Sequence, residues 1–69
     1  MRTLIYPNKN ITTYEFWEGS RVVRAHKDVL TPFYWWNLYV NDGEDITLTR
    51  GKAKTLAGVT KQAEKALRR

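Results

Sequence analysis

The stretch "FYWWNLYV", residues 33–40, decides the fold of this chain. Aromatic side chains favour a strand, and successive side chains of a strand point to opposite faces. One of the two faces is wholly apolar and is therefore expected to cover the core; it consists of Tyr34, Trp36, Leu38 and Val40. The opposite face consists of Phe33, Trp35, Asn37 and Tyr39. A half-buried strand needs apolar side chains on one face only, so the aromatics of this second face require an explanation of their own.

The residues after this stretch predict a hairpin. Asn41, Asp42 and Gly43 favour a tight turn, with Gly43 suited to a left-handed conformation. A three-residue loop pairs Leu38 with Ile46 and Trp36 with Leu48, and both strands then keep their apolar faces aligned.

The final strand is expected over residues 46–54. Thr47 and Thr49 are placed on the outer face, and Gly51 is interpreted as a bulge. Beyond the bulge the alternation resumes, with Ala53 facing inward and with Lys52 and Lys54 facing outward.

The N-terminal half predicts a second hairpin, over residues 12–27, with Glu18 and Gly19 as its loop. That loop places Tyr14 opposite Val23 and Thr12 opposite Ala25, while Glu15, Trp17, Val22 and Arg24 point to the other side. Residues 6–10 form a turn around Pro7, and residues 3–6 are either a short edge strand or a loose arm.

A helix follows the last strand. Thr55 is a suitable N-cap, and a start one turn earlier, at Gly51, is the alternative. Apolar residues recur at helical spacing, namely Leu56, Val59, Ala63, Ala66 and Leu67. The alanines allow the helix to approach closely enough to cover Trp36, and close packing of Gly58 on an aromatic ring would explain that glycine. The predicted fold is α+β, a single domain over residues 1–69 with an antiparallel sheet of three to four strands packed on one C-terminal helix.

Composition limits the class of protein. The chain has 69 residues and no cysteine, so it has neither disulfides nor thiolate metal sites. No apolar run approaches the roughly 18 residues of a membrane span, and the N-terminus does not resemble a signal peptide. We expect a soluble cytoplasmic protein that does not bind membranes.

The net charge of +5 is distributed unevenly. Residues 1–49 hold five Lys/Arg and six Asp/Glu, whereas residues 50–69 hold seven Lys/Arg and only one acidic residue, Glu64. The excess positive charge is either a solvated basic helix that maintains solubility or a binding surface for phosphates or an acidic partner.

The sequence offers little support for catalysis. We expect that the protein is not an enzyme and that it binds neither a cofactor nor a metal. His26 is the only histidine, and a lone histidine on a strand is usually a surface residue. No His/Cys/carboxylate cluster with metal-binding spacing and no glycine-rich phosphate loop are present.

The outer face of the sheet is the strongest indication of function. Aromatic rings stack on bases, while Arg, Lys and amide side chains contact base edges or phosphates. The same residues would also suit a structural cross-strand cluster, a surface covered by the N-terminal segment, or a protein interface. The candidate binding residues are Arg24, His26, Trp35, Asn37, Tyr39, Thr47, Thr49, Arg50, Lys52 and Lys54.

Residues 33–67 resemble known nucleic-acid-binding domains. The strand, turn, strand and "GKAK…A…AL" helix entry are similar to the last part of a double-stranded-RNA-binding domain, in which a KKxAK motif contacts phosphates. The matching positions are Lys52, Ala53 and Lys54. Three strands plus a C-terminal helix resemble plant AP2-type domains and the arm-binding domains of phage and transposon integrases more closely, which implies a sheet face inserted into DNA. The chain is also similar in style to short bacteriophage proteins.

The sequence therefore predicts a small basic module that binds nucleic acid, DNA in preference to RNA. The alternative is a protein-interaction module. It would be a small regulator or inhibitor that contacts an acidic protein surface, or a homodimer joined through the outer sheet faces.

Overall fold

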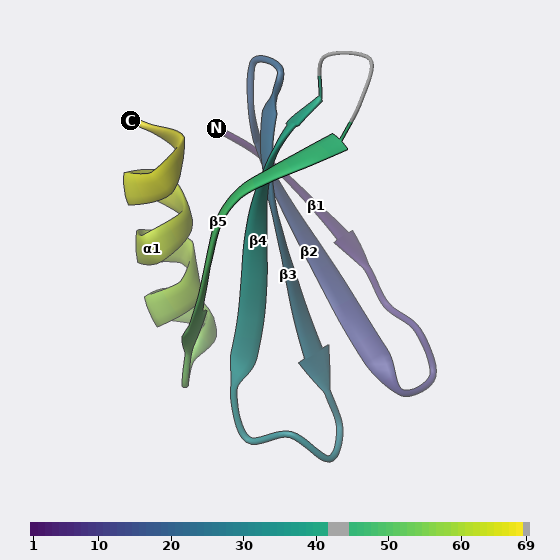
Figure 1. The fold of residues 1–69 in the computed structure, drawn as a ribbon. Helices are drawn as coiled ribbons and strands as arrows, with labels where there is room; N and C mark the ends of the chain where they lie inside the picture. The colour runs from purple at the N-terminus through teal and green to yellow at the C-terminus, as the bar shows by residue number, and fades with distance from the viewer. Residues whose placement is uncertain (42–44, 69) are drawn as a thin grey trace.

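The structure is a computed structural model that describes residues 1–41 and 45–68, without the side chains of residues 41–48. Five strands precede one helix along the chain (Figure 1). They are β1 (Arg2–Tyr6), β2 (Ile11–Glu18), β3 (Arg21–Asp28), β4 (Tyr34–Asn41), β5 (Asp45–Ala53) and α1 (Leu56–Leu67).

The strands form one antiparallel sheet in the order β1-β2-β3-β4-β5, and α1 packs on one side of it (Figure 1). The predicted α+β class and the two-layer arrangement are confirmed. The predicted number of strands, three to four, was too low, because residues 2–6 pair with β2 and form an edge strand. Of the two alternatives for the N-terminal segment, the edge strand is therefore the one observed.

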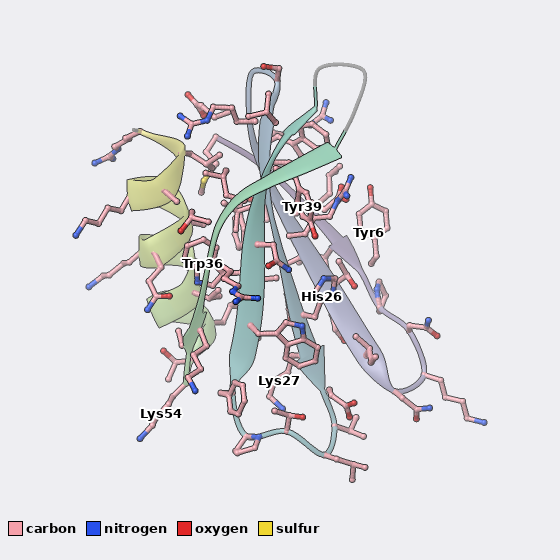
Figure 2. All side chains as sticks on the ribbon, in the orientation of Figure 1. Tyr6, His26, Lys27, Trp36, Tyr39 and Lys54 are labelled. Atoms are coloured by element: carbon pink, nitrogen blue, oxygen red, sulfur yellow. The ribbon has the colours of Figure 1, made fainter. Side chains whose placement is uncertain are left out.

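The core lies between the sheet and α1, and β4 supplies its centre. Trp36 and Leu38 are buried, as predicted, together with Phe16, Val23 and Ala25 of the first hairpin. From the helix come Val59, Ala63, Ala66 and Leu67. Trp36 points toward α1 (Figure 2), and its Nε1 donates a hydrogen bond to Oε1 of Gln62 at 2.7 Å.

The helix begins where Thr55 predicts. The Oγ1 of Thr55 accepts a hydrogen bond from the backbone N–H of Gly58 at 3.0 Å. The alternative start at Gly51 is wrong, because residues up to Ala53 pair with β4. Leu56 is exposed rather than buried, and the nearest neighbours of Gly58 are Thr55 and Ala53, not an aromatic ring. The described part of the chain contains no helix that is both long and apolar enough to cross a membrane.

The first hairpin has the predicted faces but a different register. Its loop is Gly19–Ser20, with Gly19 at a φ of 62°, and Glu18 pairs with Arg21. Tyr14 is consequently opposite Ala25 instead of Val23. The difference in register is two residues, and a shift by two leaves every side chain on its predicted face.

The register of the second hairpin also differs from the prediction. Leu38 pairs with Thr49 instead of Ile46, and Trp36 pairs with Gly51 instead of Leu48. The bulge of β5 lies at the step from Thr47 to Thr49, not at Gly51. The predicted turn at Gly43 lies outside the described residues.

The position of this bulge corrects the prediction for Thr49. A bulge inserts one residue and reverses the alternation that follows it. Thr49 therefore lies across from the core residue Leu38 and lines a hollow with Gln62 of α1, so it does not belong to the outer face. Arg50 and Lys52 lie across from the outer-face residues Asn37 and Trp35.

Candidate functional site

The outer face, which we define as the side of the sheet opposite α1, is not covered by the N-terminal segment. β1 extends the sheet beside β2 and does not cross the face of β3 or β4. Figure 2 shows His26 and Tyr39 on this side, whereas Trp36 is on the side of the helix. Three of the candidate residues on β4 (Trp35, Asn37 and Tyr39) share the outer face and are half-buried.

The β2–β4 part of the outer face contains four connected side chains, here called the Glu15 cluster (Trp17, Glu15, Arg24 and Tyr39). One carboxylate oxygen of Glu15 accepts from Trp17 Nε1 at 3.1 Å, and the other accepts from Arg24 Nε at 3.0 Å. The guanidinium of Arg24 lies 5.1 Å from the ring centre of Tyr39. Because Glu15 neutralises Arg24, this part of the face contributes no net positive charge.

Beneath the Glu15 cluster the outer face has a small apolar centre of its own. Val22 lies between Trp17 and Tyr39 in the sheet register, and its side chain is 0% exposed although it points away from α1. The two rings therefore have a structural function: they remove Val22 from water. Tyr39 and Trp17 therefore fit the alternative in which the outer aromatics form a structural cross-strand cluster.

His26 belongs to the packing of the outer face. Its Nδ1 is hydrogen-bonded to Thr13 Oγ1 at 3.0 Å, and its ring centre lies 5.7 Å from that of Trp35. Burial lowers the pKa of His26 below its ordinary value of 6.5, and the charge of Arg24 lowers it further. Among residues 1–40 and 49–68, whose side chains the structure describes, no three side chains of the kinds that bind metals gather at one place.

The remaining candidates gather at the β4–β5 corner, which consists of Phe33, Trp35, Asn37, Arg50, Lys52 and Lys54. A hollow of about 450 Å³ is lined by Trp35, Asn37, Arg50 and Lys52, together with Trp36 and Gly51. A second hollow of about 600 Å³ is lined by Pro32, Phe33, Lys52, Ala53 and Lys54. Lys52 belongs to both hollows, and its Nζ lies 5.2 Å from the ring centre of Phe33. The corner thus combines rings, an amide and cations in one place.

The charge of this corner is uncompensated within the described part of the chain. Arg50, Lys52 and Lys54 are all exposed, and the described residues provide no ion pair for any of them. Among the residues whose side chains the structure describes, no carboxylate lines either hollow. A surface with this composition attracts anions.

The motif that resembled a phosphate-binding helix entry is not part of the helix. Lys52 and Ala53 are the last residues of β5, and Lys54 lies in the bend before the N-cap Thr55. For Thr47 the structure gives only the backbone register, opposite Tyr39.

Two residues that organise the outer face were not among the binding residues predicted from the sequence. Glu15 organises Trp17 and Arg24, and Thr13 holds His26. The signal was available in the sequence, because a hairpin with Gly19–Ser20 as its loop places Glu15 directly opposite Arg24. Opposite charges on facing strand positions typically form a pair.

Comparisons of this chain with protein-family models, with curated proteins and with solved structures found no match.

Proposed function

We propose that this protein binds nucleic acid, DNA in preference to RNA, through the β4–β5 corner. One observation carries the proposal: three exposed cations (Arg50, Lys52 and Lys54) lie beside two outer rings, and the described residues that line the hollows between them include no carboxylate. Phosphates supply most of the affinity in nucleic-acid binding, and aromatic rings add stacking on the bases. The proposed site is narrower than the whole outer face, because the cation of the Glu15 cluster, Arg24, is already paired with Glu15.

The same geometry favours binding over catalysis. His26 is held by Thr13 beside Trp35 at a lowered pKa, and it lines neither hollow of the corner. A cytoplasmic location is part of the proposal and is consistent with the absence of cysteine. A relationship to AP2-type or integrase arm-binding domains remains a proposal supported by the antiparallel sheet and the C-terminal helix.

The test compares two double variants with equal loss of charge. Lys52→Ala/Lys54→Ala removes two cations from the corner, whereas Lys61→Ala/Arg68→Ala removes two exposed cations from α1 and its C-cap. Binding of fluorescein-labelled DNA is measured by anisotropy over a series of salt concentrations. We expect the corner variant to bind roughly tenfold more weakly and its log–log salt slope to be smaller by about 2, because each phosphate contact contributes about 1.

The control variant should retain most of the affinity of the original protein. Equal losses in the two double variants would show non-specific attraction by the total charge and would contradict the assignment to the corner. Absence of binding at low salt would remove the proposed function altogether.

A protein interface is the second candidate, and one observation favours it. Leu30 is 90% exposed and Val29 is 69% exposed in the β3–β4 connection, which continues into Pro32 and Phe33 of the corner. Exposed apolar residues beside a basic surface suit an acidic partner protein or a second copy of the chain. Sedimentation of the original protein and of Leu30→Ser tests the second copy. A dimer that dissociates in Leu30→Ser and persists in Lys52→Ala/Lys54→Ala would support this candidate over nucleic acid.

A further inference from the structure

The side chains of the β4–β5 corner form two adjacent rows, one along each strand. On β5 and just after it, Arg50, Lys52 and Lys54 occupy alternate positions. On and just before β4, Asn37, Trp35 and Phe33 do the same, and the register pairs Asn37 with Arg50 and Trp35 with Lys52. The contact of Lys52 with Phe33 and the shared hollows connect the rows. One side of the corner is therefore a row of cations, and the other is a row of rings and an amide.

The row of cations has the spacing of a single extended backbone. Alternate residues of a strand are about 7 Å apart, which is close to the separation of neighbouring phosphates in an extended nucleic-acid strand. Arg50 and Lys52 keep this spacing within β5, and Lys54 continues the row beyond the end of the strand. All three side chains are exposed. The cations therefore match consecutive phosphates of one strand.

The row of rings offers stacking positions beside those phosphates. Trp35 lines the hollow of about 450 Å³ and Phe33 lines the hollow of about 600 Å³, so each hollow combines one outer-face ring with two cations. Trp35 is packed beside His26, which holds its indole in place before a ligand arrives. An aromatic ring that lines an open hollow can stack on a base only if the face of that base is free.

The rest of the outer face does not suit a duplex. A duplex carries phosphates on both sides of each groove, so a sheet that enters it needs cations on both flanks of its base-reading residues. Across β4 from the corner lies the Glu15 cluster, in which Arg24 is already paired with Glu15. The next cation on this flank, Arg2, lies on the far edge strand β1, three strands from β4. The base faces of a duplex are also stacked inside the helix, where Trp35 and Phe33 cannot reach them.

We propose that the β4–β5 corner binds a single strand of nucleic acid, with its phosphates along Arg50, Lys52 and Lys54 and with successive bases on Trp35 and Phe33. This inference rests on the proposed function and specifies its ligand. The shared chemistry is an unpaired polynucleotide, from either DNA or RNA.

The experiment measures anisotropy at low salt with labelled oligothymidylate, oligouridylate and the duplex of oligothymidylate with oligoadenylate, all of equal length. We expect both single strands to bind at least about tenfold more tightly than the duplex. Trp35→Ala should weaken single-strand binding by roughly 5- to 150-fold, the range measured for loss of one stacked base. Its effect on duplex binding should be small. The two single-strand arms compare a DNA strand with an RNA strand.

Two further variants make the result decisive. Tyr6→Ala removes an exposed ring from the far edge of the same face and should leave single-strand binding unchanged (Figure 2). Trp35→Leu keeps apolar packing beside His26 but cannot stack, so it should reproduce the loss even if Trp35→Ala unfolds.

Each contrary outcome has a different consequence. Preference for the duplex would overturn this inference and leave the proposed function standing. Single-strand binding that Trp35→Leu does not weaken would overturn the assignment of the bases to this corner. No binding to any of the three probes would overturn both proposals.

Discussion

Gly51 leaves the space that the indole of Trp36 occupies. A Cβ atom at position 51 would lie 2.6 Å from Cζ2 of Trp36 and 2.9 Å from its Nε1. The same Nε1 donates to Gln62 of α1, so the ring is fixed between β5 on one side and the helix on the other. The glycine that was interpreted as a bulge thus has a packing function: it allows the largest core side chain to lie against the backbone of an edge strand.

This contact predicts that Gly51→Ala destabilises the protein. Glycine within a strand normally costs about 0.5–1 kcal/mol relative to alanine, so without the contact the substitution would be stabilising. With it, either Trp36 or β5 must move, and overpacking of this kind costs about 1–3 kcal/mol. Urea denaturation of Gly51→Ala, Trp36→Leu and the double variant measures the effect. The cost of Gly51→Ala should largely disappear in the Trp36→Leu background, and a cost that persists there would contradict the steric explanation.

The two adjacent tryptophans of β4 should respond in opposite ways to truncation. Trp36 is buried under α1, so Trp36→Ala should cost about 3–5 kcal/mol and unfold much of the population in a domain of this size. Trp35 lies on the outer face and is half-buried, so Trp35→Ala should lower the melting temperature far less. Thermal melts followed by circular dichroism check both variants. Equal destabilisation by the two substitutions would show that the outer face is a second core of equal importance.

The sequence predicted the faces of the strands better than their registers. The side-chain alternation of β4 correctly separated Trp36 and Leu38 from Trp35, because period-2 patterning determines which side is buried. It could not locate the bulge in β5: a bulge after Leu38↔Thr49 and one at Gly51 both place Lys52 outside. The consequence was that Thr49 was assigned to the wrong face.

For the candidate site, the residue types were predicted correctly, but the cross-strand pairs were missed because the hairpin loop was placed one residue too early. Arg24 and Trp35 are both on the outer face as predicted, but only the structure distinguishes their surroundings. Arg24 is bound to Glu15, whereas Trp35 lines an open hollow beside Lys52. That difference depends on the loop of the first hairpin, where a two-residue change of register replaces every cross-strand partner while leaving the faces unchanged. Composition alone contains no such information.

The lowered pKa of His26 predicts a loss of stability in mildly acidic solution. In the folded protein, burial and then Arg24 disfavour the charged imidazole, while the unfolded chain protonates near the ordinary value of 6.5. The unfolded state therefore binds more protons once the pH falls below about 6.5, and the free energy of unfolding decreases until the folded-state pKa is passed. Urea denaturation from pH 7.5 downward should show this decrease.

The matched variant for this prediction is His26→Gln, which keeps a polar group near Thr13 but does not titrate. Its stability should change less than that of the original protein in the window just below pH 6.5. An NMR titration of the His26 ring gives the independent measurement. A pKa above 6.5 in the folded protein would reverse the sign of the predicted effect.

Arg21 should stabilise the protein by donating hydrogen bonds to carbonyl groups at the C-terminal end of α1. Its guanidinium donates to the backbone carbonyl oxygens of Leu67 and Ala66 at 3.1 and 3.2 Å. The last carbonyl groups of a helix lack partners within the helix, and a cation there also interacts favourably with the helix dipole. Arg21→Met keeps most of the apolar length of the side chain and removes these donors, so it should cost about 1–2 kcal/mol. The control is Arg68→Met, since Arg68 is exposed and forms only a long ion pair with Glu64 at 3.9 Å, which predicts little change. Urea denaturation of both variants at low and high salt compares them. Equal costs for the two substitutions would mean that general charge near the helix end, and not the bond from β3 to α1, is what stabilises this part of the fold.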